Sequence, residues 1–251
     1  MTPASVLIAP DPQAVLISLV TADALPDVAR SNARLGAWIT ASGFKADSGA
    51  FLLMPGQSGA LEQVIVGLGK GDDPWATGSL AKALPKGRYR IGDAYGVAAA
   101  NLRHLHTWAA LAWALGAYQF TRYKKDGASA ADKLAHLCFP DHADRAYVER
   151  ALAGATLMRD LINTPAADMM PDALARAAEE LAYRRGAACE ITVGDDLLTK
   201  GYPMIHAVGR ASAVAPRLVD LTWGDDKHPK VTLVGKGVCF DTGGLDIKPS
   251  S

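Results

Sequence analysis

The strongest constraint on the fold is an alternation of short apolar runs with longer segments of helical periodicity along the chain. The run 14–20 (AVLISLV) has the length and composition of a buried strand, whereas 27–42 repeats apolar residues at helical spacing and is followed by Gly43. Further strands are predicted at 51–54, 63–67, 189–193, 217–223 and 230–234, and further helices at 74–84, 97–120, 145–162, 171–185 and 195–200. Buried strands that alternate with helices are typical of layered α/β proteins, so we predict an α/β fold.

The chain is long enough to hold more than one domain. Its 251 residues correspond to one large or two modest domains, at roughly 100–200 residues per domain. The segment 121–144 begins with polar and small residues (TRYKKDGASAADK), which is typical of a surface connection, and a long helix is predicted directly after it. We therefore expect an N-terminal α/β domain at 1–144 and a second α/β region at 145–251.

Composition excludes several classes of partner. The 26 basic and 26 acidic side chains leave no net charge to attract nucleic acid or an anionic membrane surface. Cys138, Cys189 and Cys239 are an odd number and form no CxxC pair, which is typical of reduced thiols. The N-terminus lacks the basic region of a secretory signal, and the longest apolar stretch, 108–118, is too short to span a bilayer. We therefore expect a cytoplasmic protein with no membrane or nucleic-acid partner.

Two motifs in the N-terminal region give weak signals. The segment 67–72 (GLGKGD) follows a predicted strand and has the glycines of a phosphate-cradling turn, but it matches neither the dinucleotide-binding nor the P-loop spacing. A plain strand-to-helix turn is favoured, and nucleotide-type binding by residues 1–144 is kept as a weaker option. His104 and His106 are two residues apart, so on a helix they face different directions and are not expected to bind one metal ion.

The end of the chain carries the strongest functional signal. The predicted strand 230–234 runs into the glycine-rich segment 235–244 (GKGVCFDTGG). Ligands of open α/β sheets bind beyond the carboxyl ends of strands, and glycines let the backbone approach a ligand closely. The carboxylate of Asp241 suits a divalent cation, while Lys236 or Lys248 could neutralise a developing oxyanion. A ligand site is favoured here over a glycine-rich structural corner.

This segment resembles a known family. Residues 235–251 (GKGVCFDTGGLDIKPSS) look like the metal-site signature of the leucyl aminopeptidase family, cytosolic exopeptidases with two metal ions. The segment 159–165 resembles the family's helix-to-loop segment, and 208–212 with 216–218 resembles its strand and turn before the site. The resemblance covers about 145–251, and residues 1–144 agree loosely with the family's variable N-terminal domain, for which a macro-like fold is one option. It implies an N-terminal α/β domain plus the first part of an α/β metallopeptidase domain, truncated after the first metal-binding motif.

Carried over residue by residue, the resemblance makes Lys236 a metal ligand, Asp241 a carboxylate that bridges two divalent metal ions, and Lys248 a catalytic lysine. Zinc or manganese is expected, with magnesium or cobalt as alternatives. A lysine binds a cation only as the neutral amine, so the pKa of Lys236 must be lowered by the metal and by burial. The metal ions would activate the water that attacks a peptide, and a charged Lys248 would stabilise the oxyanion. Asp246 has no family role and is expected to be structural.

The sequence also departs from the family pattern. Cys239 and Thr242 replace the family's common Thr and Ser, and the chain ends at Ser251 although family members are nearly twice as long. The remaining metal carboxylates are expected beyond that point, so this chain alone is expected to be inactive. The leading hypothesis is an incomplete portion of a metal-dependent aminopeptidase that acts on peptides, a homohexamer by resemblance. The alternative is a truncated or degenerate, non-catalytic member that acts as a binding or assembly module.

Overall fold

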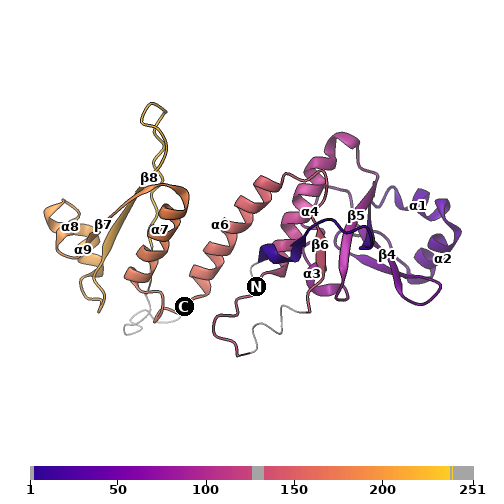
Figure 1. The fold of residues 1–251 in the computed structure, drawn as a ribbon, viewed down its shortest axis with the longest axis horizontal. Helices are drawn as coiled ribbons and strands as arrows, with labels where there is room; N and C mark the ends of the chain where they lie inside the picture. Colours follow the sequence, from indigo (N-terminus) through magenta and orange to yellow (C-terminus); the bar gives the residue numbers. More distant parts are fainter. Residues whose placement is uncertain (1–2, 126–132, 238, 240–251) are drawn as a thin grey trace, which may run out of the picture. The chain divides into compact units, whose positions relative to one another are not determined.

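The computed structural model describes residues 3–125, 133–237 and 239 of the chain (Figure 1). By its internal contacts the chain divides into two compact units, which we call unit 1 (Met1–Arg159) and unit 2 (Asp160–Ser251). The predicted domain boundary near residue 145 coincides with the start of a helix that crosses from one unit into the other. That boundary stays a prediction.

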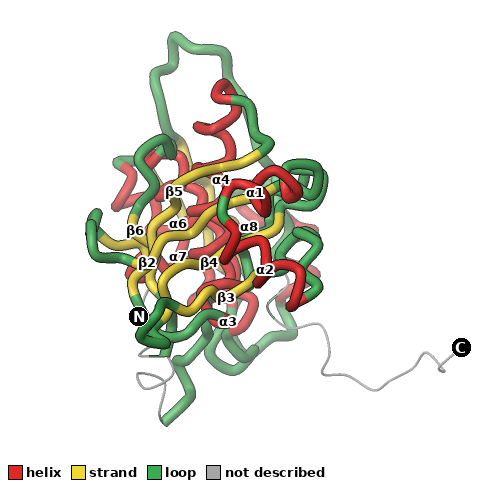
Figure 2. The backbone as a smooth tube through the Cα atoms, turned by 90° about the vertical axis from the view of Figure 1, so that its right-hand side faces the viewer, coloured by secondary structure: helices red, strands yellow, loops and turns green. Residues whose placement is uncertain are grey.

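Unit 1 is built around one sheet of six strands. Its elements in chain order are η1 (Pro3–Val6), β1 (Leu7–Ile8), β2 (Val15–Val20), α1 (Leu25–Ser31), α2 (Ala33–Ser42), β3 (Phe51–Pro55), β4 (Leu61–Gly67), α3 (Leu80–Ala83), β5 (Arg88–Tyr95), η2 (Ala99–Asn101), α4 (Leu102–Ala117), β6 (His136–Cys138) and α6 (Arg145–Asn163). The strand order is β1-β6-β5-β2-β4-β3, and Figure 2 shows the main strands side by side. All neighbours run parallel except β3 and β4, which are antiparallel.

Helices cover both faces of this sheet (Figure 1). Side chains alternate along a strand, so each strand supplies both faces. Ile17 and Leu19 of β2 pack into a core with the residues of α3 and α4, whereas Val20 packs into a second core with α1 and α2. Val64 and Val66 of β4 join the first core in the same way, and its Ile65 joins the second. The result is a three-layer α/β sandwich, which confirms the predicted fold class.

Helix α4 closely approaches the turn before α3, and a glycine at this contact makes the approach possible. A Cβ atom added at Gly116 would lie 1.6 Å from the carbonyl oxygen of Gly78, so no side chain fits between the two backbones. One turn earlier, Trp113 is fully buried, and its indole N–H donates to the carbonyl of Ala135 at 3.3 Å. These two contacts hold α4 against the turn before α3 and against the residue before β6.

Unit 2 contains a smaller sheet. Its elements are α7 (Pro171–Arg185), β7 (Ala188–Val193), α8 (Asp196–Thr199), α9 (Pro203–Gly209) and β8 (Arg217–Thr222). Strands β7 and β8 are antiparallel, and α7 packs against them through Ala175 and Ala182, both buried. Pro171 occupies the first turn of α7 and Gly186 ends it in a left-handed conformation, as expected for these residue types.

Several predicted elements differ from those in the structure. The helix predicted at 27–42 is two helices, because Asn32 is extended and its side chain accepts a hydrogen bond from the amide of Leu35 to start α2. In the segment 74–84, a turn from Gly78 to the Trp75 carbonyl leaves only α3 helical. Among the described residues, no helix is both long and apolar enough to cross a membrane.

One buried polar side chain stands out in unit 1. His106 on α4 is 5% exposed, and neither of its ring nitrogens has a hydrogen-bond partner within the described part of the chain. Its ring centroid lies 5.2 Å from that of His142. Burial, and to a smaller extent the neighbouring His142, lowers the pKa of His106, so folding favours the neutral imidazole.

We predict that Gly116→Ala destabilises unit 1 by at least about 1–3 kcal/mol, because the added methyl group must displace the Gly78 backbone. The matched control is Gly154→Ala in α6, where nothing lies within 4 Å of the added atom. That change should be neutral or stabilise by about 0.5–1 kcal/mol, as alanine is the better helix former. Urea unfolding measures both, and equal effects of the two substitutions would contradict the close approach of α4.

We also predict that unit 1 loses stability as the pH falls below about 6.5, the pKa of an exposed histidine. A folded-state pKa below the unfolded value means that the unfolded chain binds the proton first, so stability is complete above that pH and declines below it. His106→Phe should flatten the decline between pH 7.5 and 5 in urea titrations. Part of it should remain, because burial also lowers the pKa of His136. Identical pH profiles of both proteins would refute this role of His106.

Candidate functional site

The segment predicted to hold a metal follows β8. Lys236 is within the described residues and is exposed, whereas Asp241 and Lys248 lie outside them. The strand predicted at 230–234 is absent, and residues 223–237 form no helix or strand. Within the described residues no strand pairs with 230–234, so this segment lacks the hydrogen-bonding neighbour that a strand needs. Val231, Leu233 and Val234 are therefore more than four-fifths exposed (81%, 92% and 94%).

The start of the glycine-rich segment packs against α7. A Cβ atom added at Gly237 would lie 2.9 Å from Cδ2 of Leu174, so glycine permits this contact. Cys239 is half-buried, and burial raises the pKa of its thiol; the charge of Asp172 raises it further, while that of Arg217 lowers it. Gly237 therefore lies against the first turn of α7, and Cys239 lies within electrostatic reach of Asp172 and Arg217.

A salt bridge fixes the acidic side chain at this place. Oδ2 of Asp172 lies 2.7 Å from the guanidinium of Arg176, one turn along α7. This hydrogen bond lowers the pKa of Asp172 and keeps its carboxylate charged. Neither residue was singled out from the sequence, because an acidic residue in the first turn of a helix is common and needs no functional reason.

The structure gives a position to only one of the three predicted site residues. Lys236 lies next to Gly237 at the start of α7, while the predicted roles of Asp241 and Lys248 stay predictions. Within the described residues no group of three or more His, Cys, Asp or Glu side chains is arranged to hold a metal ion.

The other two segments that resemble the family have clear local structure. Arg159, near the end of α6, donates to the carbonyl of Leu115 at 2.8 Å, and its guanidinium lies 5.2 Å from the ring centroid of Tyr118. In unit 2, the amide of Gly194 donates to the carbonyl of Pro216 at 2.8 Å, which ties the end of β7 to the start of β8. Both segments therefore have structural roles near the ends of secondary-structure elements.

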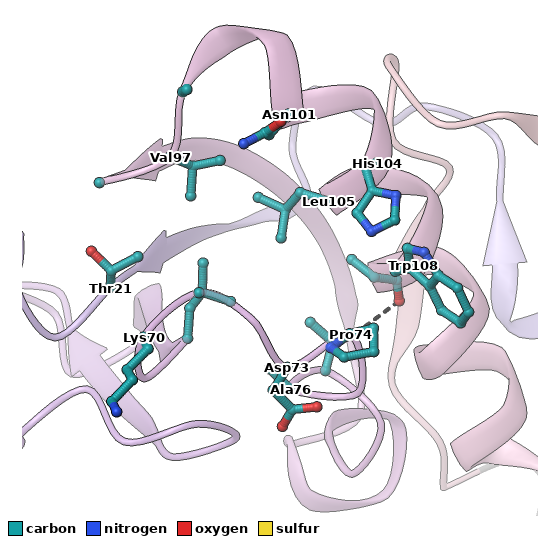
Figure 3. A pocket seen from close by; sticks show the side chains of 16 residues that line it. Thr21, Lys70, Asp73, Pro74, Ala76, Val97, Asn101, His104, Leu105 and Trp108 are labelled. Carbon is teal, nitrogen blue, oxygen red and sulfur yellow. Dashed lines mark hydrogen bonds between the residues drawn. The ribbon is translucent and has the colours of Figure 1, made fainter.

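Unit 1 contains a cavity of which the sequence indicated only one wall. It has a volume of about 350 Å³ and lies where β2, β4 and β5 end, lined by Thr21, Leu68, Lys70, Gly71, Asp73, Pro74, Ala76, Thr77, Gly96, Val97, Ala98, Asn101, His104, Leu105, Trp108 and Ala109 (Figure 3). The sequence signalled one wall of it, the glycine-rich segment 67–72. The other walls come from the turn after β5 and from α4, which periodicity could not place beside that loop.

Comparison with known proteins accounts for both units. Residues 15–140 match the family model described as M17 aminopeptidase, N-terminal domain, and residues 156–251 match that of the cytosol aminopeptidase family, catalytic domain. The chain belongs to the cytosol aminopeptidase (M17) family, which confirms the resemblance drawn from residues 235–251.

Relatives and solved structures agree with this assignment. Probable cytosol aminopeptidases of Corynebacterium efficiens and Streptomyces avermitilis are 32% and 33% identical over 85% and 86% of this chain. The crystal structure of the cytosol aminopeptidase from Coxiella burnetii has a TM-score of 0.84 at 40% identity over 98% of this chain. The bottromycin maturation enzyme BotP, solved in complex with Mn, has a TM-score of 0.64 at 27% identity over 85% of this chain.

The chain spans about half the length of these proteins. It covers 44% and 47% of the two bacterial relatives, 52% of the Coxiella burnetii chain and 46% of BotP. The activity, substrates and assembly of the whole protein are therefore matters of proposal.

Proposed function

We propose that this chain supplies the N-terminal domain, about 1–144, and the first part of the catalytic domain, from about 145, of a metal-dependent aminopeptidase. The protein would release N-terminal residues from peptides in the cytoplasm and assemble as a homohexamer. The observation that carries this proposal is the order of the two family matches, with the signature segment 235–251 inside the catalytic match.

The metal-binding side chains of the signature are of the right chemical type for a divalent metal ion, but there are too few of them. A lysine amine and a carboxylate suit zinc or manganese, and the relative BotP was solved with Mn. Each cation needs about four or more donors, so Lys236 and Asp241 cannot hold two ions by themselves. The missing donors would come from the part of the family proteins that has no counterpart in this chain.

The residues of this chain would do three things. Lys236 would bind as the neutral amine, since an ammonium group has no free electron pair. Asp241 would hold two cations with its two carboxylate oxygens. Lys248 would stay charged and donate a hydrogen bond to the oxyanion that forms at the substrate carbonyl. The bound cations would supply the activated water.

The non-catalytic alternative has less support. The relatives that match both units carry the name aminopeptidase, and no observation favours a binding or assembly module over an enzyme. We therefore favour a catalytic function, which substitutions of the signature residues can test.

We predict that Asp241→Asn lowers the affinity for Mn²⁺ and Zn²⁺ by at least about 100-fold and reduces peptide hydrolysis to background, because a neutral amide cannot bridge two cations. Both would be measured in the protein encoded by the complete gene, by metal titration and by release of N-terminal residues from peptides. Asp246→Asn, five residues away, is the matched control and should behave as wild type. Hydrolysis retained by Asp241→Asn would exclude the metal assignment.

For Lys248→Ala we expect turnover to fall about 10²–10³-fold with the metal stoichiometry unchanged, since a donor to the oxyanion acts only during the reaction. The control is Lys227→Ala, an exposed lysine outside the signature, which should retain wild-type turnover. Loss of bound metal in Lys248→Ala would mean that this lysine is a ligand, and our assignment would be wrong.

A further inference from the structure

The cavity of unit 1 lies at the position where open α/β sheets bind ligands. Strand β2 has β5 on one side and β4 on the other, and all three run parallel, so their carboxyl ends open onto the same edge. The chain leaves β2 toward β4 on one side and later returns on the other side as β5. Ligands of such sheets bind at this change of direction, and a volume of about 350 Å³ is typical of small-molecule sites.

Two loops enclose the end of β2 by close backbone contacts. A Cβ atom added at Gly71 would lie 3.2 Å from Cγ2 of Thr21, and one added at Gly96 would lie 2.0 Å from its Oγ1. Both glycines have positive φ, 83° and 77°. The backbones of the loops after β4 and β5 therefore approach Thr21 from opposite sides, and side chains larger than hydrogen are excluded from this part of the cavity.

Two features near the end of β2 favour an anionic group. Thr21 is 6% exposed and lines the cavity, yet its hydroxyl forms no hydrogen bond with any described residue. The helix formed by η2 and α4 begins at the same wall with Ala98 at its N-cap, so no side chain caps it, and its first turn has no acidic residue. Unpaired amides and the positive end of a helix dipole favour an anionic group.

The remaining walls are apolar and aromatic. Figure 3 shows Val97, Leu105 and His104 on one side of the cavity and Pro74 and Ala76 on the other. Trp108 closes one end, and its ring is packed edge-on against Trp75 with centroids 5.1 Å apart. Walls of this kind bind the faces of a planar ring.

The charged side chains restrict how such a ligand can lie. Lys70 is exposed on the loop after β4 and adds positive charge at the rim. Asp73 accepts hydrogen bonds from the hydroxyl of Ser48 at 2.5 Å and from the amide of Trp75 at 2.8 Å, which keep it ionised. An anionic group is therefore disfavoured beside Asp73 and favoured at the start of η2. Hydroxyl groups, as on a sugar, could donate to Asp73.

From these observations we infer that the cavity of unit 1 binds a nucleoside phosphate, with the phosphate at Thr21 and the start of η2 and the base between Leu105, Trp108 and the opposite wall. The site is separate from the signature segment 235–251, and the inference does not depend on the proposed peptidase activity.

Calorimetry on the full chain tests the inference with AMP, GMP and UMP as nucleotide probes and with adenosine and inorganic phosphate as fragments. At least one nucleotide should bind with a dissociation constant below about 1 mM, and each fragment at least about tenfold more weakly. Absence of binding by all three nucleotides would overturn the inference. Adenosine or phosphate binding as tightly as the nucleotide would also overturn it, because one half of the site would then have no role.

The variant Ala98→Asp distinguishes an effect of charge on nucleotide binding from an effect on protein stability. Aspartate is a good N-cap residue, and Ala98 is exposed with extended backbone angles (φ −65°, ψ 142°), so the thermal unfolding temperature should not fall. Its carboxylate should nevertheless weaken nucleotide binding at least about tenfold by repelling the phosphate. Ala98→Asn caps the same amides without a charge, so it should weaken nucleotide binding by less than Ala98→Asp does, and equal weakening by the two variants would refute the effect of charge. Equal binding by wild type and Ala98→Asp would place the phosphate elsewhere and refute the site.

Discussion

The structure of unit 1 depends on the central position of β2. This strand is hydrogen-bonded on both edges, to β4 and to β5, and it supplies side chains to the cores on both faces of the sheet. Leu19 and Val20 have no exposed surface, so each face loses packing if the strand shifts by one residue. The same arrangement places Thr21, the next residue, at the floor of a cavity that no single neighbouring element could form. The central position of β2 therefore determines both the packing of the two cores and the location of the candidate ligand site.

The sequence predicted those parts of the fold in which burial is periodic or continuous. The runs that became β2, β3 and β4, and the long helices α4, α6 and α7, follow directly from apolar patterning. Strand β5 was not predicted, because Arg88, Arg90 and Asp93 interrupt its apolar pattern and only Tyr89 is buried. It pairs on both edges but has a largely exposed side-chain pattern, so tertiary pairing rather than composition determines it.

The two candidate sites also differ in whether the sequence alone could reveal them. The signature 235–251 could be recognised from the sequence because its glycines, lysines and carboxylates are contiguous, and the family match agrees with it. The cavity of unit 1 could not be recognised, because Thr21, Lys70 and Asn101 are far apart in the chain and no spacing rule connects them. Only the parallel register of β2, β4 and β5 brings their following loops to one edge. A site whose residues are contiguous can thus be recognised from the sequence. A site whose residues are brought together by the strand order can be recognised only from the structure.

Unit 2 contrasts with unit 1 in how little it buries. A two-stranded sheet is marginally stable by itself, and the described residues of unit 2 bury few large apolar side chains, with Leu197 the only one fully buried among them. Trp223 and Leu233, by contrast, are 78% and 92% exposed. Since the free energy of local opening follows buried apolar contact, the segment that leads to the signature should open more readily than the sheet of unit 1. Binding of a cation at Lys236 and Asp241 would stabilise the folded form of unit 2 in proportion to its affinity, because a ligand that binds only the folded state shifts the unfolding equilibrium.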